Sequence, residues 1–376
     1  MDCNQVFVSK VKRLIVVFTL LIAFLSIKID TFAQVDSAVV PVDSVVAGSA
    51  EAVSGEHGPA KHGEEKFEPT KVIMEHIADS HMWHLWGHTS LPLPVILYTA
   101  NGLEFFSSGH FHHGEHDYNG KYNNYRLEED HIKVVGADGK IDEEASKSVL
   151  DFSITKNVAA MFVAIFVILV IFISVAASYR KRVGKAPKGL QSFMEPIIVF
   201  VRDDIAKPNI GHKYAKFMPY LLTTFFFILF NNLFGLIPIF PGGANVTGNI
   251  ALTFVMALGT LIIVNINGNK YYWKHIFKPD VPFWLYPIMI PVELIGIISK
   301  PFALMVRLFA NITAGHIIVL SLISLIFIFE TLAIAPVSVA FVLFMDVLEL
   351  LVAFLQAFIF TLLTALFIGM AVEEHH

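Results

Sequence analysis

Long apolar segments constrain this chain more than any other feature of its sequence. Residues 283–329 and 335–372 are each longer than the roughly 20 apolar residues that cross the hydrocarbon core of a bilayer. The chain of 376 residues is 55% hydrophobic and only 16% charged, which is too apolar for a soluble globular protein. We therefore expect an all-α polytopic membrane protein that contacts the lipid bilayer and no nucleic acid.

An arginine lies deep inside the first of these two segments. A charge at the centre of a membrane helix costs about 2.5–3.5 kcal/mol on insertion scales, so an intramembrane ionisable residue is a functional candidate. Residues three, four and seven apart share one face of a helix, which places Arg307 in a stripe of polar and small side chains. This polar stripe comprises Glu293, Gly296, Lys300, Ala303, Arg307, Ala310, Asn311 and Ala314.

Residues 1–33 have the pattern of a secretory signal peptide. Basic residues precede an apolar core at residues 14–27, and Thr31-Phe32-Ala33 resembles a cleavage site. An uncleaved membrane helix is the alternative, but the short apolar core and the polar sequence after it favour cleavage. The only cysteine is Cys3, which excludes disulfides and cysteine metal sites within one chain. We expect no cofactor.

The following residues are predicted to be exported. Residues 34–69 lack a sustained period and are rich in small residues, Glu and His, which is typical of a flexible segment. Residues 70–155 are predicted to form a small extracytoplasmic α+β domain. Its expected parts are an amphipathic helix from Thr70 to about Trp86 and short strands with turns at Asn101-Gly102 and Asp138-Gly139.

Histidines are concentrated in this exported part of the chain. One group is spaced to line a helical face, and a second forms a tight run. Metal binding is one interpretation and a proton-collecting antenna is another, but a solvated surface is the simpler hypothesis, so no metal site is predicted. The groups are His81, His84 and His88, and then His110, His112, His113 and His116.

Residues 156–376 are predicted to form a membrane domain with about five helices. Arg and Lys residues follow the first of them, and the positive-inside rule places that end in the cytoplasm. The preceding domain is then outside the bacterial plasma (inner) membrane, and five spans leave the C-terminus in the cytoplasm. The last two helices exceed one perpendicular span, so we expect a tilted or partly in-plane hairpin. The expected helices cover residues 157–178, 217–240, 249–266, 283–329 and 335–372, with a cytoplasmic connection at 189–213 that contains an amphipathic piece.

The last expected helix carries a second polar face, formed by Asp346, Glu349 and Gln356. Two antiparallel helices with facing polar groups can enclose a hydrated proton path. His316 follows Arg307 by nine residues, about 180° around an ideal helix, so the two side chains should meet different surroundings.

Several of these polar residues also have a simpler interpretation. Glu293 and Lys300 could lie at the membrane interface, and Asn311 and Gln356 could join helices by hydrogen bonds. The candidates for proton translocation are Arg307, Asn311, His316, Glu349, Gln356 and Glu293, with Lys300, Asp346 and Asn232 as lesser candidates.

The string S-K-P-F-A-L-M-V-R-L-F-A-N-I-T-A-G-H, followed by Leu355-Gln-Ala-Phe-Ile-Phe360, resembles subunit a of the F-type ATP synthase. The resemblance extends over roughly residues 158–376 and includes Asn232-Leu-Phe-Gly-Leu-Ile-Pro238. It implies a stator subunit, without bond chemistry of its own, beside a rotating ring of c subunits and bound to b-type peripheral stalk subunits and the rest of the complex. Two offset half-channels, with Arg307 between them, would carry protons, although Na⁺ remains an alternative.

The sequence departs from one familiar version of this family. Some members have Glu after the Ala-Gly pair and His seven residues before the Gln of the last helix. Here His316 follows Ala314-Gly315 and Glu349 precedes Gln356, so we expect a coupled His316–Glu349 pair in one half-channel. A secondary ion or metal transporter with a His-rich exterior is the alternative function, but the chain lacks the internal repeats that are usual in such transporters.

Overall fold

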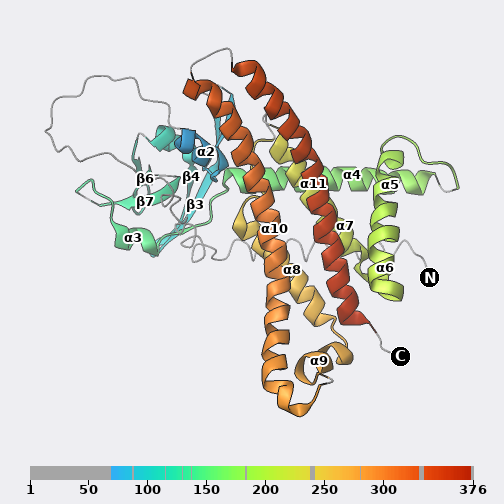
Figure 1. Ribbon diagram of the computed structural model, residues 1–376. Helices are drawn as coiled ribbons and strands as arrows, with labels where there is room; N and C mark the ends of the chain where they lie inside the picture. The colour runs from blue at the N-terminus through green and yellow to red at the C-terminus, as the bar shows by residue number, and fades with distance from the viewer. Residues whose placement is uncertain are drawn as a thin grey trace.

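The computed structural model has a small N-terminal region and a long helical part (Figure 1). Its helices include four units long and apolar enough to cross a membrane within the described residues, or five if a bent pair is one span. This agrees with the predicted polytopic membrane protein. The structure describes residues 69–86, 89–114, 116–128, 130–136, 138–182, 184–237, 242–279, 281–329 and 334–373, so the predicted signal peptide and nearly all of the predicted flexible segment lie outside it.

Residues 69–155 form what we call the N-terminal region. Its described strands pair only in antiparallel fashion, in the orders β1-β2, β4-β3-β8 and β5-β6-β7. Val95, Leu97, Phe111 and Tyr125 are fully buried in its core. The elements are α2 (Pro69–Ile77), β1 (Met82–Trp86), β2 (Thr89–Pro92), β3 (Pro94–Thr99), β4 (Gly102–Ser107), β5 (Tyr118–Asn119), β6 (Asn124–Glu128), β7 (His131–Val135), α3 (Glu143–Ser148) and β8 (Leu150–Asp151).

The helix expected from Thr70 to about Trp86 is only partly correct. It ends at Ile77, and residues 82–86 form β1 instead. The side chains alternate there, with Trp83 buried and His84 exposed, because β1 pairs with β2. The expected helical face of His81, His84 and His88 is therefore wrong: His81 binds Asp151, His84 lies 3.2 Å from the Ser90 hydroxyl, and His88 is outside the described residues.

No cluster of three His, Cys, Asp or Glu side chains suitable for a metal ion occurs in the part of the chain that the structure describes. The side chains of His112 and His113 lie outside that part.

The helical part begins directly after β8. The predicted connection at 189–213 is largely helical, since a π-helical turn at Val201–Ala206 and a 3₁₀ turn at Gly211–Lys213 join three helices into the unit Leu190–Leu236. Val201, Ile205 and Ala206 are fully buried, so packing holds this turn in place. The helices are α4 (Lys156–Lys181), α5 (Leu190–Phe200), α6 (Lys207–Ile210), α7 (Tyr214–Leu236), α8 (Ile250–Ile266), α9 (Lys270–Phe277), α10 (Tyr286–Phe329) and α11 (Ala335–Val372).

The predicted hairpin of long helices is present. The helices α10 and α11 lie side by side, and α4 runs across them, from the N-terminal region towards α5 (Figure 1). Behind the hairpin, α11 packs on α7 and α10 packs on α8. The largest buried side chains at this packing are Leu221, Phe225, Phe226, Ile228, Leu304, Leu308 and Ile368.

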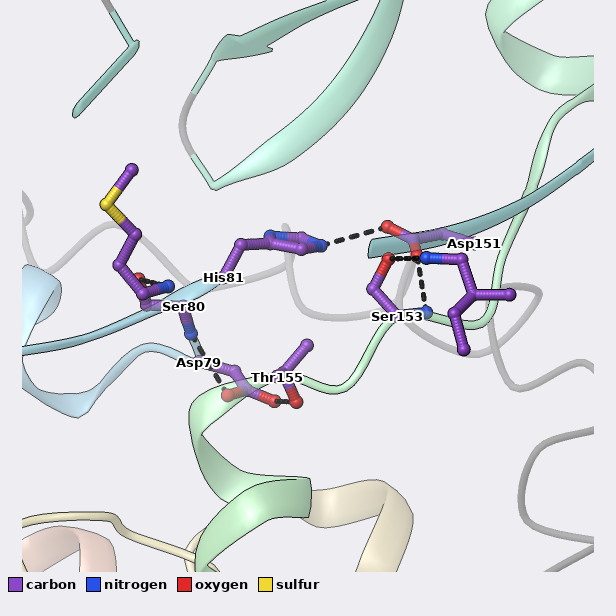
Figure 2. A network of polar contacts seen from close by, with 8 residues as sticks. Asp79, Ser80, His81, Asp151, Ser153 and Thr155 are labelled. Atoms are coloured by element: carbon purple, nitrogen blue, oxygen red, sulfur yellow. Dashed lines mark hydrogen bonds and ion pairs between the residues drawn. The ribbon is translucent and has the colours of Figure 1, made fainter. Parts of the chain in front are cut away.

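A polar junction ties the N-terminal region to the first turn of α4 (Figure 2). The Asp79 carboxylate accepts hydrogen bonds from the Asn157 backbone N–H at 3.0 Å and from the Thr155 hydroxyl at 2.7 Å. Thr155 is the N-cap residue of α4 but makes no capping bond itself. Asp79 thus caps α4 from a distant segment, where a carboxylate is also favoured by the helix dipole. The Lys156 ammonium donates to the Ala78 carbonyl at 3.0 Å.

The His81–Asp151 pair at this junction predicts a pH dependence. Burial lowers the pKa of His81, but the hydrogen bond and charge of Asp151, 3.0 Å away, outweigh it and raise that pKa above its usual value. Burial alone would raise the pKa of Asp151, but the hydrogen bond and the charge of His81 outweigh burial and lower this pKa below its usual value. The stabilisation by His81 is therefore full below its unfolded pKa of about 6.5 and is lost as pH rises through the raised pKa.

We expect hydrogen exchange at the first turn of α4, corrected for intrinsic rates, to become faster as pH rises from about 6 to 8. His81→Gln should remove most of this pH dependence. The exposed His84 provides the control, because His84→Gln should leave it unchanged. If hydrogen exchange depends on pH in the same way in the wild type and in His81→Gln, His81 is not the group responsible.

Candidate functional site

Arg307 lies on the outward face of α10. Its side chain is exposed, whereas the nearby Leu304 and Leu308, which belong to the buried core, are 1% and 0% exposed. Most of the polar stripe shares this exposure, because Lys300, Ala303, Ala310, Asn311 and Ala314 are exposed and Glu293 and Gly296 are half-buried. Arg307 has no hydrogen bond or ion pair with any residue that the structure describes. Its guanidinium is therefore available to a partner outside this chain.

Several contacts define the antiparallel register of α10 and α11. The Lys300 ammonium lies 5.6 Å from the centroid of the Phe367 ring. Further along α10, Gly315 packs against Glu349, since a Cβ on this glycine would lie 2.5 Å from Glu349 Oε1. This register brings Gln356, which is 3% exposed, to about the level of Arg307.

A small cavity, which we call the Glu349 cavity, gathers four of the predicted residues. The space open to the centre of a water molecule is about 10 Å³, enough for about one water. Glu349 Oε1 is buried without a hydrogen-bond partner among the described residues, and a buried carboxylate oxygen is costly to leave without one. The lining residues are Asn232, Leu236, Asn311, Ile312, Gly315, His316, Glu349 and Val352.

His316 and Arg307 meet different surroundings. The His316 ring faces the end of α7, because a Cβ on Gly235 would lie 3.7 Å from His316 Nε2. His316 is also half-buried, unlike the exposed Arg307. Together with Glu349, His316 gives this cavity two ionisable groups of the kinds from which proton relays in membranes are built.

Asn232 is the most firmly held polar residue of the Glu349 cavity. Its Oδ1 accepts a hydrogen bond from the Thr247 hydroxyl at 2.6 Å, and its Nδ2 donates to the Ala353 carbonyl at 3.2 Å. A donor on one side and an acceptor on the other define the orientation of the amide. Sequence reasoning did not select Thr247. Thr247 stands out in the sequence only as part of a formal glycosylation sequon that begins at Asn245. This segment is a turn here, since Asn245 Oδ1 accepts a hydrogen bond from the Gly248 N–H at 3.0 Å.

A second cavity, the Lys300 cavity, lies towards the N-terminal half of α10. It is lined by Thr260, Leu261, Val264, Tyr272, Ile297, Lys300, Pro301, Phe367 and Met370. Two turns before Lys300, Glu293 Oε1 lies 3.8 Å from Nδ1 of His275 in α9. The sequence did not single out Tyr272, whose hydroxyl donates to Asn265 Oδ1 at 3.2 Å, or Thr260, whose hydroxyl lies 3.0 Å from that of Tyr220.

The predicted residues thus fall into separate groups. Asn232, Asn311, His316 and Glu349 share one cavity, and Lys300 lines the other, with Glu293 nearby. Arg307 lies between the two cavities along α10, and Gln356 of α11 is buried at about the same level. Asp346 is exposed and lines neither of these two cavities.

Known proteins resemble the chain over both of its parts. The family model described as ATP synthase A chain matches residues 158–369, and one described as a domain of unknown function (DUF8433) matches residues 72–152. ATP synthase subunit a of Chlorobium phaeobacteroides is 40% identical over 382 aligned positions, which cover 98% of this chain and 95% of the relative.

Two further relatives bear the same name. ATP synthase subunit a of Chloroherpeton thalassium is 51% identical over 233 positions, 60% of this chain and 69% of the relative. That of Anaeromyxobacter dehalogenans is 38% identical over 92% of this chain and 88% of the relative. With a family model matching more than half of its length and a full-length relative at 40% identity, the chain belongs to the ATP synthase subunit a family.

Proposed function

We propose that this chain conducts protons through two half-channels beside a rotating c-ring and thereby couples a transmembrane proton gradient to ATP synthesis or hydrolysis. The observation that carries the proposal is the position of Arg307 between two cavities along α10, each of which includes polar side chains in its lining. Along the helix axis, Arg307 is about 10 Å from Lys300 and about 13 Å from His316. Neither of these two cavities extends past it, so protons would leave one path and enter the other by way of the ring.

The outward face of α10 suits a close helix partner that carries a carboxylate. Ala303, Ala310 and Ala314 flank the exposed Arg307, and small side chains allow helices to approach closely in a membrane. A guanidinium is not deprotonated in proteins, so it cannot relay a proton. It favours the ionised form of a passing carboxylate instead and blocks direct proton transfer between the two paths.

The arrangement of the helices supports paths to opposite sides of the membrane. We place the N-terminal region outside and the basic end of α4, with Arg180, Lys181 and Arg182, in the cytoplasm. Because α10 and α11 run across α4 (Figure 1), a spanning α4 leaves the hairpin strongly tilted. The Glu349 cavity would then serve the outer path and the Lys300 cavity the inner one. The b-type stalk and the remaining subunits complete the proposed assembly, and nothing here favours a secondary transporter.

Replacing Arg307 tests the central claim. In inverted vesicles with the assembled complex, Arg307→Ala should reduce ATP-driven acidification at least about tenfold, and Arg307→Lys should restore little because lysine lacks the permanent planar charge. Arg126→Ala is the matched control, since its ion pair with Asp117 is on the surface of the N-terminal region. Acidification that survives Arg307→Ala in assembled complexes would refute the proposal.

Exchanging His316 and Glu349 tests their coupling. Each of His316→Glu and Glu349→His alone should lower acidification by roughly tenfold or more, because one proton-exchanging group of the cavity is lost. The double exchange should recover much of this loss, so that the two effects are strongly non-additive. If the double variant slows acidification by the product of the two single effects, the two residues act independently and not as a pair.

Gly315→Ala should displace the Glu349 carboxylate, because the new Cβ would lie 2.5 Å from Oε1. We expect severalfold slower acidification without loss of assembly. Gly296→Ala is the matched control on the same helix, as its Cβ would meet nothing within 4 Å, and alanine is the better helix former by about 1 kcal/mol. Equal rates for both variants would mean that the position of Glu349 beside Gly315 has no part in conduction.

A further inference from the structure

The N-terminal region contacts more of the helical part than α4 alone. Trp83 of β1 is 3% exposed and belongs to an apolar cluster that joins the N-terminal region to several segments of the helical part. Ala160 and Met161 of α4 and Phe227 of α7 are members, as are Ala244 and Val246 of the loop between α7 and α8. Ala244 and Val246 are 2% and 3% exposed, so this cluster covers these two apolar side chains of the loop.

This loop also carries the residue that orients Asn232. Thr247 follows Val246 directly, is 1% exposed, and donates its hydroxyl to Asn232 Oδ1 at 2.6 Å. Asn232 in turn lines the Glu349 cavity with His316 and Glu349. The apolar cluster that contains Trp83 and Val246 is therefore linked through Thr247 and Asn232 to the cavity.

The loop's own hydrogen bonds hold its shape locally. Asn245 Oδ1 accepts from the Gly248 N–H at 3.0 Å, and the Gly243 N–H donates to the Phe234 carbonyl at 3.3 Å. These bonds join neighbours within the turn and the end of α7. The Trp83 cluster is the contact that fixes the loop to β1 and α4. Trp83 is itself placed by the junction two residues earlier, where His81 binds Asp151 (Figure 2).

We propose that Trp83 is a positioning residue for proton conduction: it holds the α7–α8 loop so that Thr247 keeps the Asn232 amide oriented in the Glu349 cavity. This inference rests on the proposed function and extends it to the N-terminal region, which the ATP synthase family model does not cover. Trp83 acts through Thr247 and does not touch the proton path itself.

A double-mutant cycle in inverted vesicles tests the link. Trp83→Leu and Thr247→Val should each slow ATP-driven acidification by several-fold at equal amounts of assembled complex, measured as the ratio of this subunit to c subunits. The double variant should be no slower than the slower single variant, because both changes break one connection. Trp83→Phe should restore most of the rate, since a phenyl ring retains much of the apolar contact.

A second variant covers the case in which Trp83→Leu does not assemble. Val246→Ala truncates a loop side chain in the same apolar cluster and leaves the N-terminal region unaltered. Its effect on the rate of acidification should also be non-additive with that of Thr247→Val. Phe105→Ala is the control, as Phe105 is on the same region but 68% exposed, and it should leave acidification unchanged.

The inference is overturned if the double variant slows acidification by the product of the two single effects. A normal rate in assembled Trp83→Leu or Val246→Ala would also overturn it. Arg307→Ala in the same vesicles separates this failure from that of the proposed function. If Arg307→Ala abolishes acidification while the effects of Trp83→Leu and Thr247→Val multiply, only the positioning role is wrong.

Discussion

The close packing of α10 against α11 at Gly315 is the contact on which the polar interior depends. Glycine leaves room for the Glu349 side chain between the helices, with Oε1 buried. The neighbouring polar groups, His316, Asn311 and Asn232, surround the same space. Because the helices are antiparallel and long, a register defined at this point extends along the hairpin, so that Gln356 comes opposite Arg307 and Phe367 beside Lys300. One helix–helix contact thus organises both cavities.

The long helices could be predicted from the sequence because their signal is local. The last helix extends from Ala335 to Val372 as predicted, since an uninterrupted apolar run leaves few alternatives. The exposed stripe around Arg307 also followed from helical periodicity. The expectation of a His316–Glu349 pair needed more, namely the family resemblance and the exchange of residue types, and in the structure both residues line one cavity.

Other contacts of the site have no recognisable pattern in the sequence. The bond from Thr247 to Asn232 and the contact of Tyr220 with Thr260 join segments that are distant in the sequence. The sequence pattern around a threonine or tyrosine in a loop or an apolar helix is the same whether or not its hydroxyl has a partner. The strand β1 was mistaken for helix because apolar residues in this short stretch fit both periods, and pairing with β2 decided the outcome.

The N-terminal region is joined to the helices by ionisable groups that are paired. Asp79, His81, Asp151 and Lys156 all have partners at the junction, which compensates for removing them from water. Such a network permits few alternative arrangements, because a shift of one residue would leave several charges without partners. The apolar cluster around Trp83 adds contact area next to it. The two together make the region a fixed part of the molecule in this structure.

The cap of α4 has a consequence for the order in which the chain can be completed. Asp79 precedes the helix that it caps, so its carboxylate leaves the ribosome well before the Asn157 N–H that will need it. When α4 emerges, the acceptor for its first turn already exists on a segment made earlier. If the capping residue were downstream instead, the N–H groups in the first turn of a newly inserted helix would lack this acceptor until more of the chain had been synthesised.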